Sequence, residues 1–200
     1  VTIQKALRMM NSKQLEAFDV NQASAQTRAT FGDSQFGRGC LAAIQLISAG
    51  VRCVEVTLQG WDTHANNHES HTRQNAVLDP AFAALIRELR TRKMLDQTIV
   101  ICAGEFGRTP KINAASGRDH WPTGFSLALA GGGFRAGHIH GATDPTGKNK
   151  QPTDPIQVAD IHSTVLHALG IEYDKEMMTP IGRPMALSDG QVIHELLKKS

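Results

Sequence analysis

Three short motifs concentrate acidic and histidine side chains at the ends of apolar runs: residues 60–64 (GWDTH), 104–110 (GEFGRTP) and 117–122 (GRDHWP). The first two follow runs that are typical of buried strands, over residues 51–58 and 98–103. In an open α/β sheet, ligands and chemistry gather just beyond the carboxyl ends of the strands. Carboxylate and imidazole ligands at such a place are what a hydrolytic metal site needs, so the motifs predict a metal-dependent enzyme.

In the first motif, Asp62 and His64 are two residues apart. Side chains at i and i+2 of an extended chain project from the same side, so both can reach one cation. His68 follows four residues after His64 and would complete a ligand pair if this loop were helical. The alternative is a solvent-exposed, histidine-rich loop in which Asp62 caps the following turn.

In the second motif, Glu105 lies two residues beyond the apolar run, between Gly104 and Gly107. A carboxylate at this place can ligate a metal or act as a general base. Arg108 has two interpretations: an ion pair with Glu105, or recognition of an anionic substrate oxygen through its planar guanidinium. We expect Glu105 and Arg108 to be the catalytic residues of this segment.

In the third motif, Asp119 and His120 are adjacent, so they point in opposite directions in an extended chain. We expect His120 to be the metal ligand, and Asp119 to be the second candidate ligand or a group that supports the ligand or caps the turn. The alternative for Asp119 is a turn in which its carboxylate accepts backbone hydrogen bonds.

Other histidines are assigned differently. His162 falls within an apolar stripe of a predicted helix and His167 on the opposite face, which favours a packing role for His162. His138 and His140 lie in a predicted strand or turn and stay unassigned. A Gly-x-Ser-x-Gly elbow, the mark of an α/β-hydrolase nucleophile, does not occur in the sequence.

The elements that must position these residues alternate along the chain. Helices are predicted over residues 36–50, from Asp79-Pro80 onward and over 156–169, and strands over 51–58, 98–103 and 125–130. An N-cap acid and a proline at the first helical position mark the start at Asp79 and Pro80. The continuously apolar run 98–103 predicts a strand that is buried on both faces. The alternation predicts an α/β fold with a mainly parallel sheet, in which the first two strands are parallel.

The 200 residues suit one domain, 1–200, of an ordinary globular protein with 40% hydrophobic and 20% charged residues. The net charge of +2, with acidic and basic residues intermixed, excludes the basic footprint of a nucleic-acid-binding protein. No apolar run approaches the ~20 residues of a membrane span. Cys40, Cys53 and Cys102 fit no metal motif, and we expect buried free thiols, with a disulfide between two of them as the alternative.

The motifs, in this order, resemble the bacterial DUF1501 family, a domain of unknown function. The resemblance runs from Ala17-Phe18-Asp19 to the end of the chain and also includes residues 36–41 (FGRGCL) and 182–184 (GRP). That family is related to the alkaline phosphatase and sulfatase superfamily. The resemblance therefore implies an alkaline-phosphatase-like three-layer α/β/α sandwich with a metal site at the strand ends. It also implies a twin-arginine export signal and a periplasmic or secreted location.

The resemblance also implies an order of metal ligands: Asp62 and His64 first, then Glu105, then His120. The chain departs from the superfamily at the second place, which reads Glu105-Phe106 and has no adjacent histidine. The superfamily's nucleophile and its first aspartate ligand come from an N-terminal half. Because the chain has no initiator Met, we expect it to be the C-terminal portion of a longer domain, inactive on its own.

These observations predict a hydrolase of phosphate or sulfate esters that uses a divalent metal, namely Zn, Ca, Mg or Mn. Its substrate would be a small anionic ester or a sulfated or phosphorylated glycan. Two alternatives stay open. The first is a non-catalytic member of the family that binds a glycan or a protein, which the departure at Glu105-Phe106 favours. The second is a single metal ion with a purely structural role.

Overall fold

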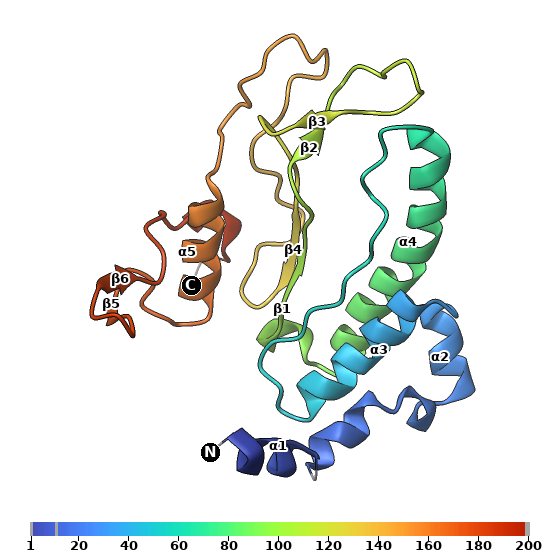
Figure 1. The fold of residues 1–200 in the computed structure, drawn as a ribbon, viewed down its shortest axis with the longest axis vertical. Helices are drawn as coiled ribbons and strands as arrows, with labels where there is room; N and C mark the ends of the chain where they lie inside the picture. The colour runs from blue at the N-terminus through green and yellow to red at the C-terminus, as the bar shows by residue number, and fades with distance from the viewer. Residues whose placement is uncertain (1, 11, 199–200) are drawn as a thin grey trace. The chain divides into compact units, whose positions relative to one another are not determined.

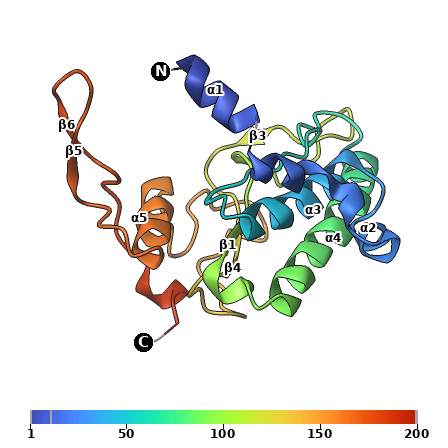
Figure 2. The same cartoon turned by 90° about the horizontal axis from the view of Figure 1, so that it is seen from below.

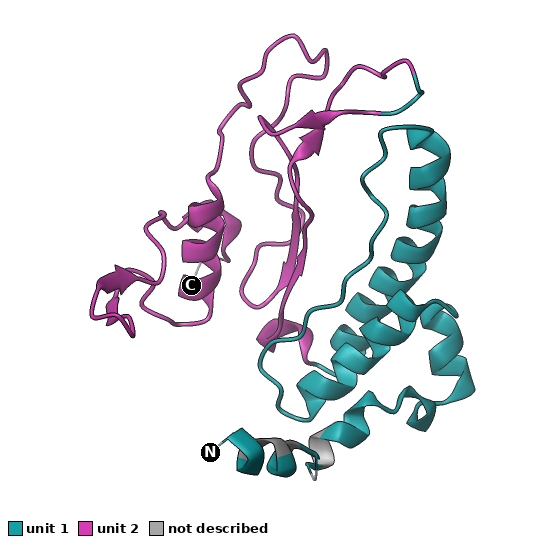
Figure 3. Ribbon diagram, viewed as in Figure 1, with its two compact units in different colours: residues 1–93, 115–117 teal, residues 94–114, 118–200 magenta. Residues whose placement is uncertain are grey.

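The first part of the chain is helical, and the second part contains short antiparallel strand pairs and one α-helix. The computed structural model describes residues 2–10 and 12–198, and the chain divides into two compact units (Figure 3). Unit 1 comprises Val1–Lys93 and Ala115–Gly117, and unit 2 comprises Met94–Ala114 and Arg118–Ser200. The expectation of a single domain over residues 1–200 stays a prediction.

Unit 1 is helical. Its elements are α1 (Thr2–Met10), the 3-10 turns η1 (Lys13–Phe18) and η2 (Val20–Gln22), α2 (Ala25–Phe31), α3 (Gln35–Ser48) and α4 (Asn67–Thr91). Helix α3 confirms the helix predicted over residues 36–50. It begins where the Ser34 hydroxyl accepts a hydrogen bond from the Gly37 N–H at 2.9 Å, which satisfies one of the free donors of the first turn.

The core of unit 1 lies where α2, α3 and α4 meet, and α3 and α4 run side by side in both views (Figures 1 and 2). Its most buried side chains are apolar: Phe31, Cys40, Leu41, Ile44, Ala81, Ala84 and Leu89. Full burial of one Leu, Ile or Phe side chain contributes ~1.5–3 kcal/mol. This core therefore stabilises the helices that flank the first motif.

Helix α4 begins at Asn67, so the predicted start at Asp79 and Pro80 is wrong. Pro80 lies inside the helix, where it removes one backbone donor. The full burial of Ala81 and Ala84 stabilises the helix across this position, because tertiary packing outweighs local propensity. Within the described residues, no helix combines the length and the apolar character that crossing a membrane requires.

Residues 51–58 are extended but form no strand, which corrects the first predicted strand. Arg52 and Glu55 face solvent, while Val56 packs against α3 so closely that a side chain at Gly39 would collide with it. The segment therefore buries its apolar side on a helix and not within a sheet. Cys53 is exposed, contrary to the expectation of a buried thiol, whereas Cys40 is buried, and none of the three cysteines forms a disulfide.

The described residues of unit 2 form three antiparallel strand pairs. Strand β1 (Ile99–Cys102) pairs with β4 (Ala128–Gly131), β2 (Gly107–Arg108) with β3 (His120–Trp121), and β5 (Glu176–Met178) with β6 (Pro184–Ala186). In the first pair Ile99 lies opposite Gly131 and Cys102 opposite Ala128. The 3-10 turns η3 (Leu95–Gln97) and η4 (His194–Leu196) and helix α5 (Val158–Ala168) complete the unit. Figure 2 shows the β5–β6 hairpin next to α5.

The predicted mainly parallel, three-layer α/β/α sandwich is wrong, because each sheet in the described residues has two antiparallel strands. A parallel pair needs a long crossover, usually a helix. Between β1 and β4 the chain forms only β2 and β3, so β4 returns antiparallel to β1. Strand β1 is not buried on both faces either, since Ile101 is 46% exposed.

Helix α5 confirms the helix predicted over residues 156–169 but buries a different face. Ser163 and Thr164 are fully buried, whereas His162 is exposed, so the predicted packing role of His162 is wrong. The helix begins with a capping box in which the Gln157 N–H donates to Asp160. Its buried hydroxyls bind the chain that follows β6: Ser163 donates to Ser188, and Thr164 accepts from the Ile193 N–H.

Candidate metal-binding and anion-binding residues

The first motif forms an acid–imidazole pair within unit 1. Nε2 of His64 lies 3.1 Å from Oδ1 of Asp62, and the two side chains are 48% and 63% exposed. Thr63, between them, is 6% exposed and points inward. The alternation confirms that residues 62 and 64 share one side of an extended chain. Ligands of one ion, each ~2.0–2.2 Å from the metal, lie within about 4 Å of each other, so this pair fits a cation.

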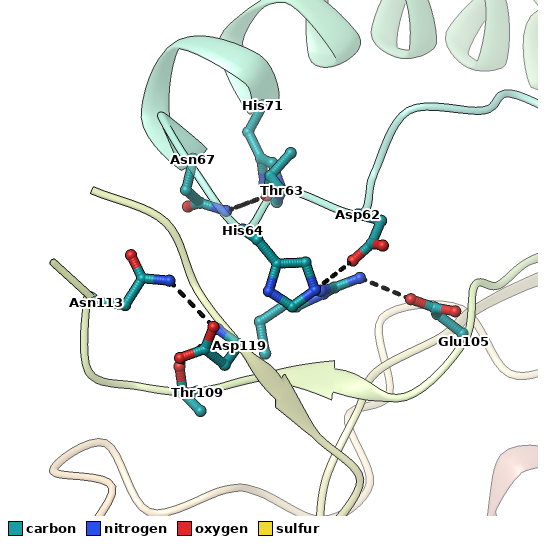
Figure 4. A network of polar contacts seen from close by, with 10 residues as sticks. Asp62, Thr63, His64, Asn67, His71, Glu105, Thr109, Asn113 and Asp119 are labelled. Atoms are coloured by element: carbon teal, nitrogen blue, oxygen red, sulfur yellow. Dashed lines mark hydrogen bonds and ion pairs between the residues drawn. The ribbon is translucent and has the colours of Figure 1, made fainter. Parts of the chain in front are cut away.

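A buried polar network holds the inward side of the motif (Figure 4). The Asn67 amide donates to the Thr63 hydroxyl at 2.6 Å, and Nε2 of His71 lies 3.2 Å from each of these side chains. The His71 ring also meets the Trp61 ring edge-on at 5.3 Å. Because buried polar groups are costly when unpaired, the network fixes the backbone that carries Asp62 and His64.

The start of the third motif packs on the first. Ala65 and Ser116 form an antiparallel bridge, and the Asn67 N–H donates to the Ser116 carbonyl at 2.9 Å. Gly117 is buried so close to His64 that a Cβ atom would collide with the His64 carbonyl. A glycine is therefore required at the point where residues 115–117 support the metal-ligand segment.

Unit 2 joins the second motif to the rest of the third. In the β2–β3 ladder, Arg108 lies opposite His120. The Thr109 N–H donates to the Asp119 carbonyl at 2.9 Å and extends the ladder by one residue. The rings of Phe106 and His120 are in contact, with centroids 4.5 Å apart. Two segments that are separated in the sequence thus form one polar edge.

At this edge Glu105 and Arg108 form an ion pair, with a guanidinium nitrogen 2.7 Å from the carboxylate. The Arg108 side chain is only 12% exposed, and its guanidinium carbon lies 6.0 Å from the centre of the Phe106 ring. Glu105 is 56% exposed. Of the two interpretations of Arg108, the ion pair is present, and a second, anion-binding role stays a prediction.

Asp119 and His120 have different surroundings. Oδ1 of Asp119 accepts a hydrogen bond from the Asn113 amide at 3.0 Å, and its backbone N–H donates to Thr109 Oγ1. Neighbouring Arg118 donates to the carbonyls of Thr109 and Pro110. These bonds give Asp119 a role in ordering the loop, while the exposed His120 imidazole lies on the ladder.

The predicted ligands therefore fall into two sets, each described within its own unit. Asp62 and His64 lie together in unit 1, and Glu105, Arg108, Asp119 and His120 lie along the β2–β3 segment of unit 2. The predicted convergence of all of them on one cation stays a prediction. His68 lies on α4 and is exposed, and His71 joins the buried network instead.

Sequence reasoning missed a third set in unit 2. His138 and His140 lie close to Glu195, with Nδ1 of His140 2.5 Å from the Glu195 carboxylate. The signal was present in part, since His138 and His140 have the same i, i+2 spacing as Asp62 and His64. Glu195 lies more than 50 residues after His140 in the sequence, so no local spacing predicts that the two side chains meet.

A family model described as a protein of unknown function (DUF1501) matches residues 1–197. Comparison with curated proteins and with solved structures gives no match.

Proposed function

We propose that this chain, which belongs to the DUF1501 family of proteins of unknown function, is a metal-dependent hydrolase of phosphate or sulfate esters. The proposal rests on the chain's own side chains. The observation that carries the proposal is the Asp62–His64 pair, with its ligand atoms 3.1 Å apart on the exposed side of a segment held by buried hydrogen bonds. A carboxylate and an imidazole on a rigid backbone are a preorganised pair of ligands for a divalent ion.

Each set of residues has a distinct part. Asp62 and His64 would hold the cation, which is Zn, Ca, Mg or Mn, whereas Glu105 and His120 are the candidate ligands within unit 2. A bound divalent ion supplies Lewis-acid polarisation of the ester oxygen and lowers the pKa of an attacking group. Arg108, rigidly placed by Phe106 and Glu105, would direct its planar guanidinium at an anionic ester oxygen. The substrate is a small anionic ester or a sulfated or phosphorylated glycan.

A relationship to the alkaline phosphatase and sulfatase superfamily, with export to the periplasm or beyond, belongs to the same proposal. The order of the acidic and histidine motifs along the chain supports it: residues 62 and 64, then 105, then 120. Detection of the protein in the periplasmic or extracellular fraction of its native cells would support export, and its retention in the cytoplasm would contradict it.

The test is turnover of p-nitrophenyl phosphate and p-nitrophenyl sulfate by the full-length protein. We expect chelation to abolish turnover and one of the four divalent ions to restore it. Asp62→Asn and His64→Ala should each reduce metal affinity by at least ~10–100-fold, because loss even of a group that only orients a ligand costs that much. The matched control is His68→Ala, an exposed histidine on α4.

Two results would contradict the proposal: full turnover after chelation, or full turnover in both Asp62→Asn and His64→Ala. Retained far-UV circular dichroism and an unchanged unfolding midpoint of the metal-free variants would separate loss of a ligand from loss of the fold. Because both side chains are exposed, we expect the metal-free fold to be unaffected.

A non-catalytic role is the second candidate, and one observation favours it. The Glu105 carboxylate, which would be a ligand or a general base, is already held by Arg108 at 2.7 Å. A member of this kind would bind a sulfated glycan or a protein without turnover. Saturable binding of a sulfated oligosaccharide, weakened by Arg108→Lys and unaffected by chelation, would favour this candidate over the hydrolase.

A further inference from the structure

His138, His140 and Glu195 form a compact group in unit 2 that the proposed hydrolase site does not use. Each offers one ligand atom, and these atoms all lie within 4.8 Å of one another. His138 and His140 are partly buried, and the Ile139 side chain between them is 88% exposed. Because alternate side chains of an extended segment share one side, both imidazoles face away from Ile139 and toward Glu195.

Backbone pairing holds this histidine segment at both ends. Upstream, Phe134 bridges Leu197, and the Arg135 N–H donates to the Leu196 carbonyl at 2.8 Å. Downstream, Ala142 bridges Thr153 through two backbone hydrogen bonds of 2.8 and 3.2 Å. The upstream bridge involves the residues next to Glu195, so it brings the carboxylate beside the imidazoles and fixes their separation.

The position of Glu195 is also fixed from the side of α5. The Ile193 N–H donates to the buried Thr164 hydroxyl at 3.0 Å, and the Gln191 N–H donates to the Asp160 carboxylate at 2.8 Å. Turn η4, which contains Glu195, begins directly after Ile193. Ligands fixed by independent backbone contacts are preorganised, which is what a metal site requires of its surroundings.

The polar atoms of the group are incompletely satisfied. Nε2 of His138 is buried and has no hydrogen-bond partner among the described residues. Burial of an imidazole nitrogen without a partner is costly, so such an atom calls for an explanation. Nδ1 of His140 lies 2.5 Å from Oε1 of Glu195. A cation would give both imidazoles and the carboxylate a common partner.

We propose that His138, His140 and Glu195 bind a first-row divalent transition-metal ion of the zinc class. Two imidazoles and one carboxylate are the ligand set of borderline cations, whereas Mg²⁺ and Ca²⁺ prefer sites built from oxygen atoms. The atoms need only small movements, since ligands at ~2.0–2.2 Å from one ion lie about 3.4 Å apart in tetrahedral geometry. The contact of 2.5 Å between His140 and Glu195 must lengthen.

The group also borders a cavity, which provides access to the ion. His140 and Glu195 line a cavity of about 670 Å³ in unit 2, together with Ile156, Asp189 and His194. Three protein ligands leave a tetrahedral ion one position for water or for a small ligand. The site is therefore an open one, separate in its residues from Asp62 and His64.

The test is a Zn²⁺ titration of the untagged, metal-free full-length protein against a chromophoric chelator, in an Asp62→Asn/His64→Ala background. We expect one Zn²⁺ to bind in that background. His140→Ala or Glu195→Gln should weaken this binding by at least ~10–100-fold, since even outer partners of a metal site contribute that much. Co²⁺ should give visible absorption bands of a tetrahedral or five-coordinate site, and these bands should disappear in Glu195→Gln.

The matched control is His194→Ala, which removes another imidazole that lines the same cavity and should leave Zn²⁺ affinity unchanged. Glu195→Gln keeps the side-chain shape and so tests the site even if His140→Ala, at a partly buried position, fails to fold. The proposal is overturned if the background variant binds no Zn²⁺, if Glu195→Gln and His140→Ala both bind it as tightly as the background, or if Ca²⁺ binds as tightly as Zn²⁺.

Discussion

At the scale of single residues, the first motif divides its work between two sides of one extended segment. Asp62 and His64 face solvent as potential ligands, and Thr63 faces inward to Asn67 and His71. An inward hydrogen-bonded residue between two outward ligands restricts how far either ligand can move. The geometry of the pair therefore depends on a network that touches no substrate.

Replacing Asn67 by alanine tests that dependence. The change leaves the buried Thr63 hydroxyl and the His71 ring without their shared amide, so the free energy of unfolding should fall by ~1–3 kcal/mol. Urea denaturation of the metal-free protein measures it. The control is His68→Ala, one residue along the same helix and exposed, which should change stability by less than about 0.5 kcal/mol. Equal stability of the two variants would show that the network contributes nothing.

At the scale of elements, helix α5 is attached by hydroxyl groups more than by apolar side chains. Ser163 and Thr164 are fully buried, while Val158 and Leu169 are more than half exposed. Thr164 donates to the Asp160 carbonyl at 2.6 Å and accepts from the Ile193 N–H. Through these bonds the helix positions the segment that leads to Glu195.

Thr164→Val removes one hydroxyl without changing the volume and leaves the Ile193 N–H without its acceptor. We expect a loss of ~1–3 kcal/mol in the free energy of unfolding, because an unsatisfied buried donor costs that much. Zn²⁺ affinity at the His138–His140–Glu195 site should also fall. His162→Ala, on the exposed face of the same helix, should stay within about 0.5 kcal/mol of the parent. A larger loss in His162→Ala than in Thr164→Val would restore the packing role that the sequence favoured.

The loop over residues 141–153 is organised by one carboxylate. Asp144 accepts hydrogen bonds from the Asn149 N–H, the Thr146 N–H and the Thr146 hydroxyl. The backbone N–H of Asn149, followed by that of Thr146, lowers the pKa of Asp144 below its ordinary value. A lowered pKa means that the ordering of the loop is complete above the ordinary carboxyl pKa. The ordering is lost as the pH falls through the lower value.

At the scale of the whole molecule, the chain leaves unit 1 after Lys93 and contributes to it again at Ala115–Gly117. In this short segment, Ser116 forms the bridge to Ala65, and Gly117 lies close to the His64 backbone. The third motif therefore supports the first through its glycine, and unit 1 depends on residues that are distant in sequence.

Gly117→Ala tests this dependence. A Cβ atom would collide with the His64 carbonyl, so the backbone must move, and overpacking of this kind costs ~1–3 kcal/mol. We expect a lower unfolding midpoint and weaker metal binding at Asp62 and His64. Gly104→Ala is the control, since nothing lies within 4 Å of its Cβ position. Wild-type metal affinity in Gly117→Ala would mean that the return segment does not position the ligands.

Local features of the site followed from the sequence alone. The i, i+2 spacing of Asp62 and His64 placed both side chains on one side of the chain, and the apolar periods gave helices α3 and α5 and strand β1. The start of α4 and the inward face of α5 did not follow, because tertiary packing of Ala81, Ala84, Ser163 and Thr164 overrides the local signals.

The sequence by itself determined which side chains follow the apolar runs and which of them share one side of the chain. Both depend only on spacing and side-chain alternation, which are properties of the local backbone. Only the tertiary structure decided the pairing of strands and the partners of distant residues. The run over 51–58 packs on a helix, β4 returns antiparallel to β1, and Glu195 meets His140. Such contacts join segments far apart in the chain, and no local period specifies which of several apolar or polar partners a segment will find.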